Sequence, residues 1–254
     1  PGYNSGDDDT NNNRAAEKEE ALVMMGCHRS TAKLWLYQLV DALEHMHQRG
    51  IVHRDLKAEN ILLNSNNDIV LIDFGTAKDL MFTDLNGPEF VGTPDFMSPE
   101  AVTGRDDGGT KDVADIADTG PAADLWALGA LTVQLQTGHT PYWSPSPYLA
   151  FLKIKKALKY PNLRRPVGIV DDECWDFIQQ LMKGQANERL GANVFDEIDT
   201  DQRRMKQRDG GYDCLRQHPY FADVHAERNA KKSKSLPIPS LWDFAVRACA
   251  EMAY

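Results

Sequence analysis

Two short motifs contain the side chains of this sequence that could do chemistry. Residues 53–60 read His-Arg-Asp-Leu-Lys-Ala-Glu-Asn, and residues 73–75 read Asp-Phe-Gly after a short apolar run. Transfer of a phosphoryl group needs a carboxylate to orient the attacking hydroxyl, a cation beside the phosphate and oxygen ligands for magnesium. The two motifs together contain all three kinds of group.

Four side chains of these motifs fit that chemistry. Asp55 can accept the proton of the attacking hydroxyl, and Lys57 can pair with the transferred phosphate. Asn60 and Asp73 can bind Mg²⁺ through oxygen, the ligand type that this hard cation prefers. The sequence therefore predicts phosphoryl transfer, with Asp55 and Lys57 as catalytic residues and Asn60 and Asp73 as metal ligands.

One long helix is expected before the first motif. Apolar residues recur at helical spacing between Leu34 and Met46, which predicts a helix over 31–48. Ser30 is expected to be its N-cap, and Gly50 its stop. Such a helix would deliver the chain directly to the first motif.

Short strands and further helices must complete the fold. Three apolar runs are too short for helices and predict small strands at 51–52, 61–63 and 69–72. The loop that follows Phe74 is about 25 residues long, and loops of that length usually carry function. Further helices are expected to begin at Pro99 and to cover 121–136, 147–158, 171–182 and 212–218. The helix over 121–136 is apolar on most faces and belongs in the core.

The two motifs resemble the catalytic loop and the metal loop of the eukaryotic protein kinases, H-R-D-x-K-x-x-N and D-F-G. Three later segments extend the likeness in the family's order. Residues 98–100 resemble A-P-E with serine in place of alanine, 124–129 resemble D-x-W-x-x-G, and 188–191 contain the family's late arginine.

Within this family the sequence is most similar to the AGC group. Residues 73–78 and 90–93 resemble the phosphoinositide-dependent branch, whose members phosphorylate activation loops of other AGC kinases. The resemblance covers about residues 32–221. It implies a serine/threonine protein kinase that uses ATP and Mg²⁺ and acts on protein substrates.

The resemblance implies an α+β fold that is mainly α, namely a kinase C-terminal lobe with small β-hairpins at the catalytic cleft. The N-terminal lobe is missing, because nothing upstream of His53 resembles the G-x-G-x-x-G strand pair, the V-A-I-K lysine or its glutamate partner. We expect a disordered acidic and polar segment at 1–26, the C-terminal lobe at 27–222 with a surface insertion at about 104–120, and a C-terminal tail at 223–254.

The missing lobe has a physical consequence. Half of the adenine pocket and the lysine–glutamate pair belong to that lobe, so the chain is expected to be a fragment that is inactive or nearly so alone. We also expect an exposed apolar upper face, which would need the N-terminal lobe or an equivalent covering surface as a partner.

The resemblance also assigns residues to the nucleotide and to the substrate. The implied cofactor-binding residues are Lys57, Glu59, Asn60, Leu62 and Asp73, with Leu62 beneath the adenine. In some relatives the glutamate that matches Glu59 meets an arginine of the substrate. Gly92 and Thr93 would line the substrate groove and indicate a serine or threonine acceptor, because Thr93 would hydrogen-bond near Asp55 and Lys57.

A further set of residues is expected to support the site. Glu100 and Arg189 would form a buried ion pair, Asp124 would hold the backbone of the catalytic loop, and His53 would stack on Phe74. The complete implied set is His53, Arg54, Phe74, Gly75, Lys78, Glu100, Asp124 and Arg189.

Glu89 is the most informative departure from the family pattern. Most AGC kinases have a phosphorylated serine or threonine at this position, just before Phe-Val-Gly-Thr. A carboxylate here could pair with Arg54 and Lys78 and order the loop without phosphorylation, although it imitates the charge of a phosphate only partly. The alternative is an exposed glutamate with no partner, since surface pairs often contribute nothing measurable.

Composition and charge exclude several other classes of protein. The chain has 254 residues, of which 42% are hydrophobic and 26% are charged, as in an ordinary globular protein. A formal net charge of −10 argues against nucleic acid as a partner. Four scattered cysteines suggest reduced thiols, and no apolar run is long enough for a transmembrane segment. The expected location is the cytoplasm, with the nucleus as an alternative.

Two other functions remain open. A kinase-like lobe could serve as a non-catalytic scaffold or binding module, which the missing lobe favours and the intact Asp55, Lys57, Asn60 and Asp73 disfavour. A small-molecule kinase of similar fold is disfavoured by the segments at 92–93 and 98–100, because in the family these shape a groove for a polypeptide.

Overall fold

The computed structural model describes residues 26–81, 91–103, 120–157, 163–166, 168–199, 204–208 and 210–232. Several predictions fall outside these residues. They concern the segment up to residue 25, Glu89 and its pairing with Arg54 and Lys78, the insertion over 104–119, and the tail from residue 233.

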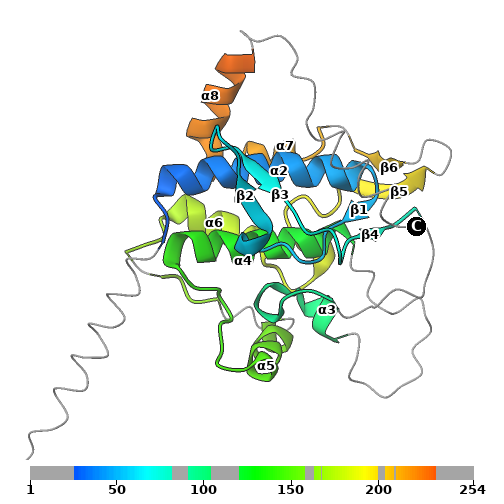
Figure 1. Cartoon of the computed structure of the whole chain (residues 1–254), viewed down its shortest axis with the longest axis vertical. Coiled ribbons are helices and arrows are strands. Elements are labelled where there is room, and N and C mark those ends of the chain that lie inside the picture. The colour runs from blue at the N-terminus through cyan, green and yellow to red at the C-terminus, as the bar shows by residue number, and fades with distance from the viewer. Residues whose placement is uncertain are drawn as a thin grey trace, which may run out of the picture.

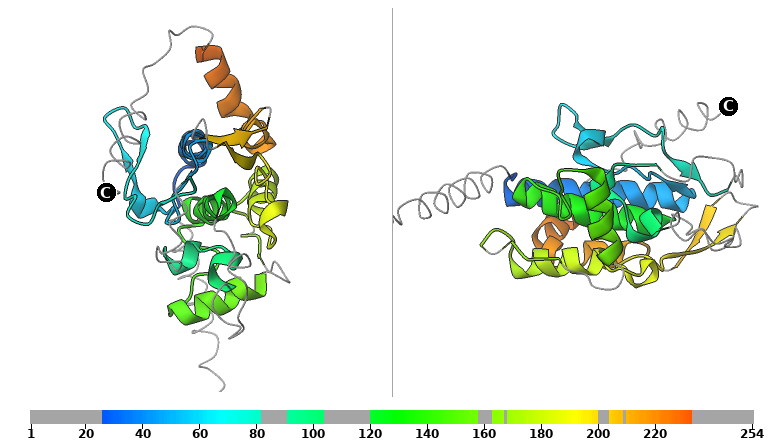
Figure 2. Two further views of the ribbon diagram at one scale, coloured as in Figure 1. Left: turned by 90° about the vertical axis from the view of Figure 1, so that its right-hand side faces the viewer. Right: turned by 90° about the horizontal axis from the view of Figure 1, so that it is seen from below.

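Two long helices form the centre of the domain. Helices α2 (Arg29–Gln48) and α4 (Pro121–Thr137) pack side by side, and α6 (Asp172–Leu181) packs on α4 (Figures 1 and 2). Twelve of the 17 residues of α4 are buried, including Trp126. The helix ends at Gly138, which adopts the left-handed conformation with φ of 81°. The prediction of a core helix over 121–136 is confirmed.

The prediction that Ser30 caps the first long helix is wrong. The N-cap of α2 is His28, and its carbonyl oxygen accepts the hydrogen bond of Ala32 N at 3.0 Å. Ser30 lies inside the first turn, where its hydroxyl contacts His28 Nδ1 at 2.8 Å. The hydroxyl is therefore paired with an imidazole rather than with a free backbone N–H.

Two small two-stranded antiparallel sheets frame the two motifs. Strand β1 (Ile51–Val52) pairs with β4 (Lys78–Asp79), and β2 (Ile61–Leu63) pairs with β3 (Ile69–Leu71). The three predicted strands are confirmed, and β4 was not expected. The short 3₁₀ helix η1 (Ala58–Asn60) connects the first motif to β2.

Shorter helices complete the described part of the chain. In sequence order they are η2 (Pro94–Phe96), α3 (Pro99–Thr103), α5 (Pro147–Ala157), η4 (Ala186–Glu188), α7 (Asp213–Arg216) and η5 (Pro219–Phe221). Helices α3 and α5 lie at the end of the domain opposite to the β2–β3 hairpin (Figures 1 and 2). The predicted helices that begin near 99, 147 and 171 are confirmed, and the one expected over 212–218 is shorter.

A third two-stranded sheet was not predicted. Strand β5 (Phe195–Asp199) pairs with β6 (Arg204–Gln207), and the register shifts between Phe195 and Ile198. The segment is mostly charged and lacks an alternating apolar pattern. Its anchor is Phe195, which is buried and packs edge-on against Tyr212.

Helix α8 (Ala222–Lys232) was also not predicted, because it holds to α2 through polar contacts rather than an apolar stripe. Asp223 pairs with Lys33 at 3.1 Å, and Arg228 pairs with Asp41 at 2.9 Å. The start of the expected tail at 223–254 is thus a helix packed on the domain. No helix in the described ranges combines the length and apolar character needed to span a bilayer.

Candidate active site

Three side chains form a closed hydrogen-bonded group at the first motif. Lys57 Nζ donates to Asp55 Oδ2 at 2.7 Å and to Thr93 Oγ1 at 2.8 Å, and the Thr93 hydroxyl donates to Asp55 Oδ1 at 2.8 Å. Asp55 is only 8% exposed. The loop that contains Thr93 is thereby tied to the catalytic loop, as the resemblance implies.

The surroundings of Asp55 keep it ionised. Burial alone would raise the pKa of this carboxyl, but hydrogen bonds from Lys57 and Thr93 and the charge of Lys57 outweigh burial. The pKa of Asp55 is therefore lowered from its ordinary value. An ionised carboxylate accepts hydrogen bonds only, which suits a group that orients and deprotonates a hydroxyl.

Asn60 and Asp73 fit the expected magnesium ligands by the chemistry of their free oxygens. The Asn60 amide nitrogen donates to Asp55 O at 2.8 Å and to Asp55 Oδ2 at 3.2 Å, which leaves the amide oxygen for a cation. Asp73 is exposed, and its Oδ1 accepts from Gly75 N at 3.3 Å. In the described ranges there is no cluster of three or more His, Cys, Asp or Glu for a metal. A Mg²⁺ ion here would need further oxygens from nucleotide phosphates and water.

Asp124 holds the backbone that carries Asp55. Its carboxylate accepts from His53 N at 2.8 Å and from Arg54 N at 2.9 Å, and Arg54 has a left-handed φ of 66°. Residues other than glycine adopt this conformation only when surrounding contacts impose it. The role that the resemblance implies for Asp124 matches this geometry.

The sequence analysis missed His47 as part of this support. His47 is fully buried, and its Nε2 lies 2.9 Å from Asp124 Oδ2 while its Nδ1 lies 2.6 Å from the Tyr212 hydroxyl. Because Asp124 is ionised, the Nε2–H of His47 donates to its carboxylate. Burial raises the pKa of Tyr212 well above its usual value, so this hydroxyl remains protonated.

The buried Asp124 makes the stability of the domain depend on pH. Burial would raise its pKa, but hydrogen bonds from His47 and His53 and their charges lower it below the ordinary value of 3.8. A lowered folded pKa contributes stability that is present above about pH 4 and is lost as pH falls through the folded pKa. We expect the gap in unfolding free energy between wild type and Asp124→Asn to shrink as pH falls from 7 to 3.

Urea denaturation across this pH range measures that gap. The control is Asp172→Asn, because the Asp172 side chain is 91% exposed. A gap for Asp124→Asn that stays constant with pH would contradict the assignment of a low pKa.

The second motif is fixed by contacts with the first. The rings of His53 and Phe74 lie 5.2 Å apart, and His53 Nε2 is 3.1 Å from Ile72 O. Arg54 Nε donates to Thr76 O at 2.6 Å, just after the Asp-Phe-Gly residues. These contacts set the position of Asp73 relative to Asp55.

The predicted ion pair between Glu100 and Arg189 is present. Both Arg189 terminal nitrogens donate to the Glu100 carboxylate at 2.6 Å. Arg189 also donates to Ala122 O at 2.7 Å and lies over the Trp126 ring. The side chain of Arg189 is 0% exposed. The pair therefore links α3 to the core through a fully buried guanidinium group.

Gly92 is needed where the loop that contains Gly92 and Thr93 touches the catalytic loop. We call this loop the substrate loop. Its φ is +108°, and a Cβ at this position would lie 2.6 Å from Arg54 O. We expect Gly92→Ala to lower the unfolding free energy by roughly 2 kcal/mol or more, through backbone strain and a steric clash.

Gly168→Ala is the matched control for this prediction. Gly168 also has a positive φ, of +82°, but a Cβ there would meet nothing within 4 Å. Urea denaturation of both variants separates strain from clash. Equal losses of unfolding free energy in the two variants would show that the clash of the new Cβ with Arg54 O does not destabilise the fold.

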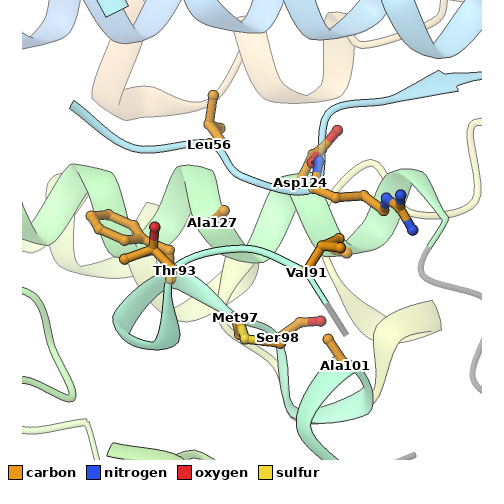
Figure 3. A pocket seen from close by; sticks show the side chains of 11 residues that line it. Leu56, Val91, Thr93, Met97, Ser98, Ala101, Asp124 and Ala127 are labelled. Atoms are coloured by element: carbon orange, nitrogen blue, oxygen red, sulfur yellow. The ribbon is translucent and has the colours of Figure 1, made fainter. Parts of the chain in front are cut away.

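A small pocket lies between the catalytic loop and the substrate loop (Figure 3). Leu56 and Asp124 line it on one side, and Val91 and Met97 line it on the other. Ser98, which replaces the family's alanine, is buried beside it, and its hydroxyl has no hydrogen-bond partner among the described groups. The lining contains neither Asn60 nor Asp73, so this pocket is not the nucleotide site.

The expected nucleotide floor lies on the exposed face of the β2–β3 hairpin. Leu62 and Val70 are paired across the strands and are 52% and 39% exposed. This is the exposed apolar face that the sequence predicts. Glu59 is exposed on η1, and Lys78 lies in β4.

Comparison with known proteins agrees with this geometry. The family model described as "Protein kinase domain" matches residues 13–198. The chain therefore belongs to the protein kinase family.

The relatives place the chain in the AGC group. It is 32% identical over 206 residues to serine/threonine-protein kinase sck1 of Schizosaccharomyces pombe, over 81% of this chain and 25% of that protein. It is 32% identical over 216 residues to 3-phosphoinositide-dependent protein kinase 1 of Homo sapiens, over 82% of this chain and 33% of that protein. It is 33% identical over 208 residues to serine/threonine-protein kinase SCH9 of Saccharomyces cerevisiae, over 82% of this chain and 21% of that protein. The chain thus spans a third or less of these relatives.

Proposed function

We propose that these residues form the catalytic C-terminal lobe of a protein kinase that transfers the γ-phosphate of MgATP to serine or threonine of protein substrates. The observation that carries the proposal is the closed group of Asp55, Lys57 and Thr93, with the Asn60 amide oxygen left for a cation. A purely structural lobe would not require a cation, a carboxylate and a metal ligand at one point.

Each side chain has a separate task in this proposal. Bound MgATP supplies the phosphoryl group and the charge that stabilises its transfer. Asp55 accepts a hydrogen bond from the substrate hydroxyl and takes its proton, while Lys57 neutralises charge beside the transferred phosphate. Asn60 and Asp73 would hold the metal through oxygen.

The contacts of Thr93 support the proposal that the acceptor residue is serine or threonine. Its hydroxyl joins Asp55 and Lys57, so the substrate loop is fixed against the catalytic base. As the finer part of the proposal, we infer that the substrates include activation loops of other AGC kinases. This inference is supported by the likeness to 3-phosphoinositide-dependent protein kinase 1.

We further propose that an N-terminal lobe from outside these residues completes the nucleotide site. The described residues supply the lower side of that site at Leu62, Asn60 and Asp73. The exposed Leu62 and Val70 are the surface that such a lobe would cover.

The test is to express the chain together with the coding sequence upstream of Pro1. We expect phosphate transfer from ATP to serine- and threonine-containing peptides and little transfer to tyrosine peptides. The chain alone is expected to have little or no activity. Absence of transfer by the extended protein with any peptide acceptor would favour the second candidate, a kinase-like binding module.

A further inference from the structure

Tyr212 contains a buried hydroxyl that no step of the proposed transfer uses. The residue is 0% exposed, and its hydroxyl oxygen lies 2.6 Å from Nδ1 of His47, which is also 0% exposed. Burial keeps the pKa of Tyr212 well above its usual value, so the hydroxyl stays protonated. Because both residues are sealed from solvent, bulk water cannot replace either partner of this hydrogen bond.

His47 connects the hydroxyl to the catalytic loop. Its Nε2 lies 2.9 Å from Asp124 Oδ2, the same oxygen that accepts from His53 N at 2.8 Å. The other oxygen of Asp124 accepts from Arg54 N at 2.9 Å. The Asp124 side chain is only 1% exposed, so these donors hold its charge in the interior. A continuous chain of hydrogen bonds therefore runs from Tyr212 through His47 and Asp124 to the backbone of the catalytic loop.

The orientation of the His47 ring decides whether Asp124 receives its hydrogen bond. The two nitrogens of an imidazole are distinct positions on the ring, and the hydrogen bond made by one of them fixes where the other points. Rotation of the ring by half a turn would point Nε2 away from Asp124 and leave a buried carboxylate without one of its donors. The Tyr212 hydroxyl opposes this rotation, because it holds Nδ1 at 2.6 Å.

Tyr212 is itself held in place by helix α2, which carries His47. The backbone N–H of Tyr212 donates to Glu44 Oε1 at 2.8 Å, and Glu44 lies about one turn before His47. The Tyr212 ring packs edge-on against the rings of His47 and Phe195, at centroid distances of 5.8 and 5.3 Å. Strand β6, which precedes Tyr212, packs on α2 toward the C-terminal end of the helix (Figure 1). Packing and a backbone hydrogen bond therefore fix where the hydroxyl lies.

The contact lies beyond the part of the chain that the family model matches. That match covers residues 13–198, and Tyr212 comes after it. The strands that precede Tyr212 follow no apolar periodicity either. The family match therefore does not account for the contact between Tyr212 and His47.

We propose that Tyr212 is a positioning residue for the catalytic loop. Its hydroxyl orients the His47 ring so that Nε2–H faces Asp124. Asp124 in turn holds the backbone at His53 and Arg54. The proposal rests on the proposed function for the reaction that the loop performs. The alternative is a purely structural role through packing of the ring, and it assigns no task to the hydroxyl.

Tyr212→Phe separates the two roles, because it removes the hydroxyl and keeps the ring. NMR of the whole chain reads the result without any need for activity. We expect the backbone amide signals of His53 and Arg54 to shift, and their hydrogen exchange to accelerate by about threefold to tenfold. Tyr220→Phe is the matched control, since Tyr220 is also 0% exposed and its hydroxyl pairs with Gln136 Nε2 at 3.1 Å. The control is expected to leave both amide signals unchanged.

Kinetics of the extended protein show whether the position of the loop affects phosphate transfer. We expect Tyr212→Phe to lower kcat by about threefold to tenfold, as for loss of one neutral hydrogen bond, with KM for ATP and for a serine peptide unchanged. In a His47→Gln background the same substitution should lower kcat no further, because effects of residues in one hydrogen-bonded network are not additive. Tyr220→Phe should keep the wild-type kcat.

Three results would overturn the positioning role of Tyr212. The first is an unchanged kcat, or unchanged amide signals of His53 and Arg54, in Tyr212→Phe. The second is the same set of changes in Tyr220→Phe. The third is a loss of kcat that persists undiminished in the His47→Gln background. If the extended wild type transfers phosphate to no peptide, the proposed function fails, and the amide signals still decide whether Tyr212 positions the loop.

Discussion

Replacing Asp55 by asparagine is expected to abolish most of the phosphate transfer by the extended protein and to leave the fold intact. Asparagine has nearly the same size, but its single amide oxygen can accept from only one of Lys57 and Thr93, and it cannot take the proton of the substrate hydroxyl. Loss of a general base usually costs about 10² to 10⁴ in rate. The measurement is kcat with a serine peptide, together with the free energy of unfolding.

The expected loss in unfolding free energy of Asp55→Asn is about 1–3 kcal/mol, because the replacement keeps the volume of the side chain but removes one hydrogen bond and the pairing with Lys57. Asp172→Asn is a control, since the Asp172 side chain is 91% exposed and has no assigned role in transfer. Wild-type kcat in Asp55→Asn would remove Asp55 from the mechanism.

The second large effect concerns stability. Glu100→Leu is expected to lower the free energy of unfolding by about 3–5 kcal/mol, because it leaves the guanidinium of Arg189 buried without its counter-charge. The Arg189 side chain is 0% exposed, so water cannot replace the carboxylate. Urea denaturation at neutral pH measures the loss.

The double variant Glu100→Leu/Arg189→Met distinguishes a stranded charge from lost packing. It should regain part of the stability, because replacing both members of a buried pair by apolar groups is often nearly neutral. The exposed pair of Arg165 and Asp172 is the matched control, and Asp172→Ala should cost less than about 1 kcal/mol. If the double variant is no more stable than Glu100→Leu, the loss of unfolding free energy comes from lost packing rather than from a stranded charge.

The candidate site could be predicted largely because its chemistry is local in sequence. Asp55, Lys57 and Asn60 lie within six consecutive positions, so the motif nearly fixes their proximity. The contact of Thr93 with this group spans 38 residues and was expected only through the family resemblance. Its confirmation in the structure depends on Gly92, which lets the substrate loop approach Arg54 O.

The missed parts of the fold depend on contacts that no local pattern shows. His47 appears in sequence as a helix-end histidine, yet its partners Asp124 and Tyr212 lie 77 and 165 residues away. The β5–β6 hairpin is anchored mainly by Phe195, and single apolar residues in a charged segment give no strand periodicity.

Helix α8 and the start of α2 illustrate the same limit. Helix α8 is held by ion pairs such as the one between Arg228 and Asp41, whose members lie 187 positions apart in the chain. At the start of α2, Ser30 has the right residue type for a cap, but its hydroxyl hydrogen-bonds with the imidazole of His28 instead. Cap preferences describe a local tendency that neighbouring side chains can override.

The central claim is that Asp55, Asn60 and Asp73 face one site for a metal–nucleotide complex. The direct measurement is NMR of the whole chain during titration with Mn²⁺ and ATP, since paramagnetic broadening reports proximity to the metal even when binding is weak. The account predicts that the signals of the Asn60 amide group and of the backbone at Asp55 and Asp73 broaden first, and that Asp73→Asn abolishes the effect. Broadening elsewhere in the chain, or at only one of the two motifs, would contradict it.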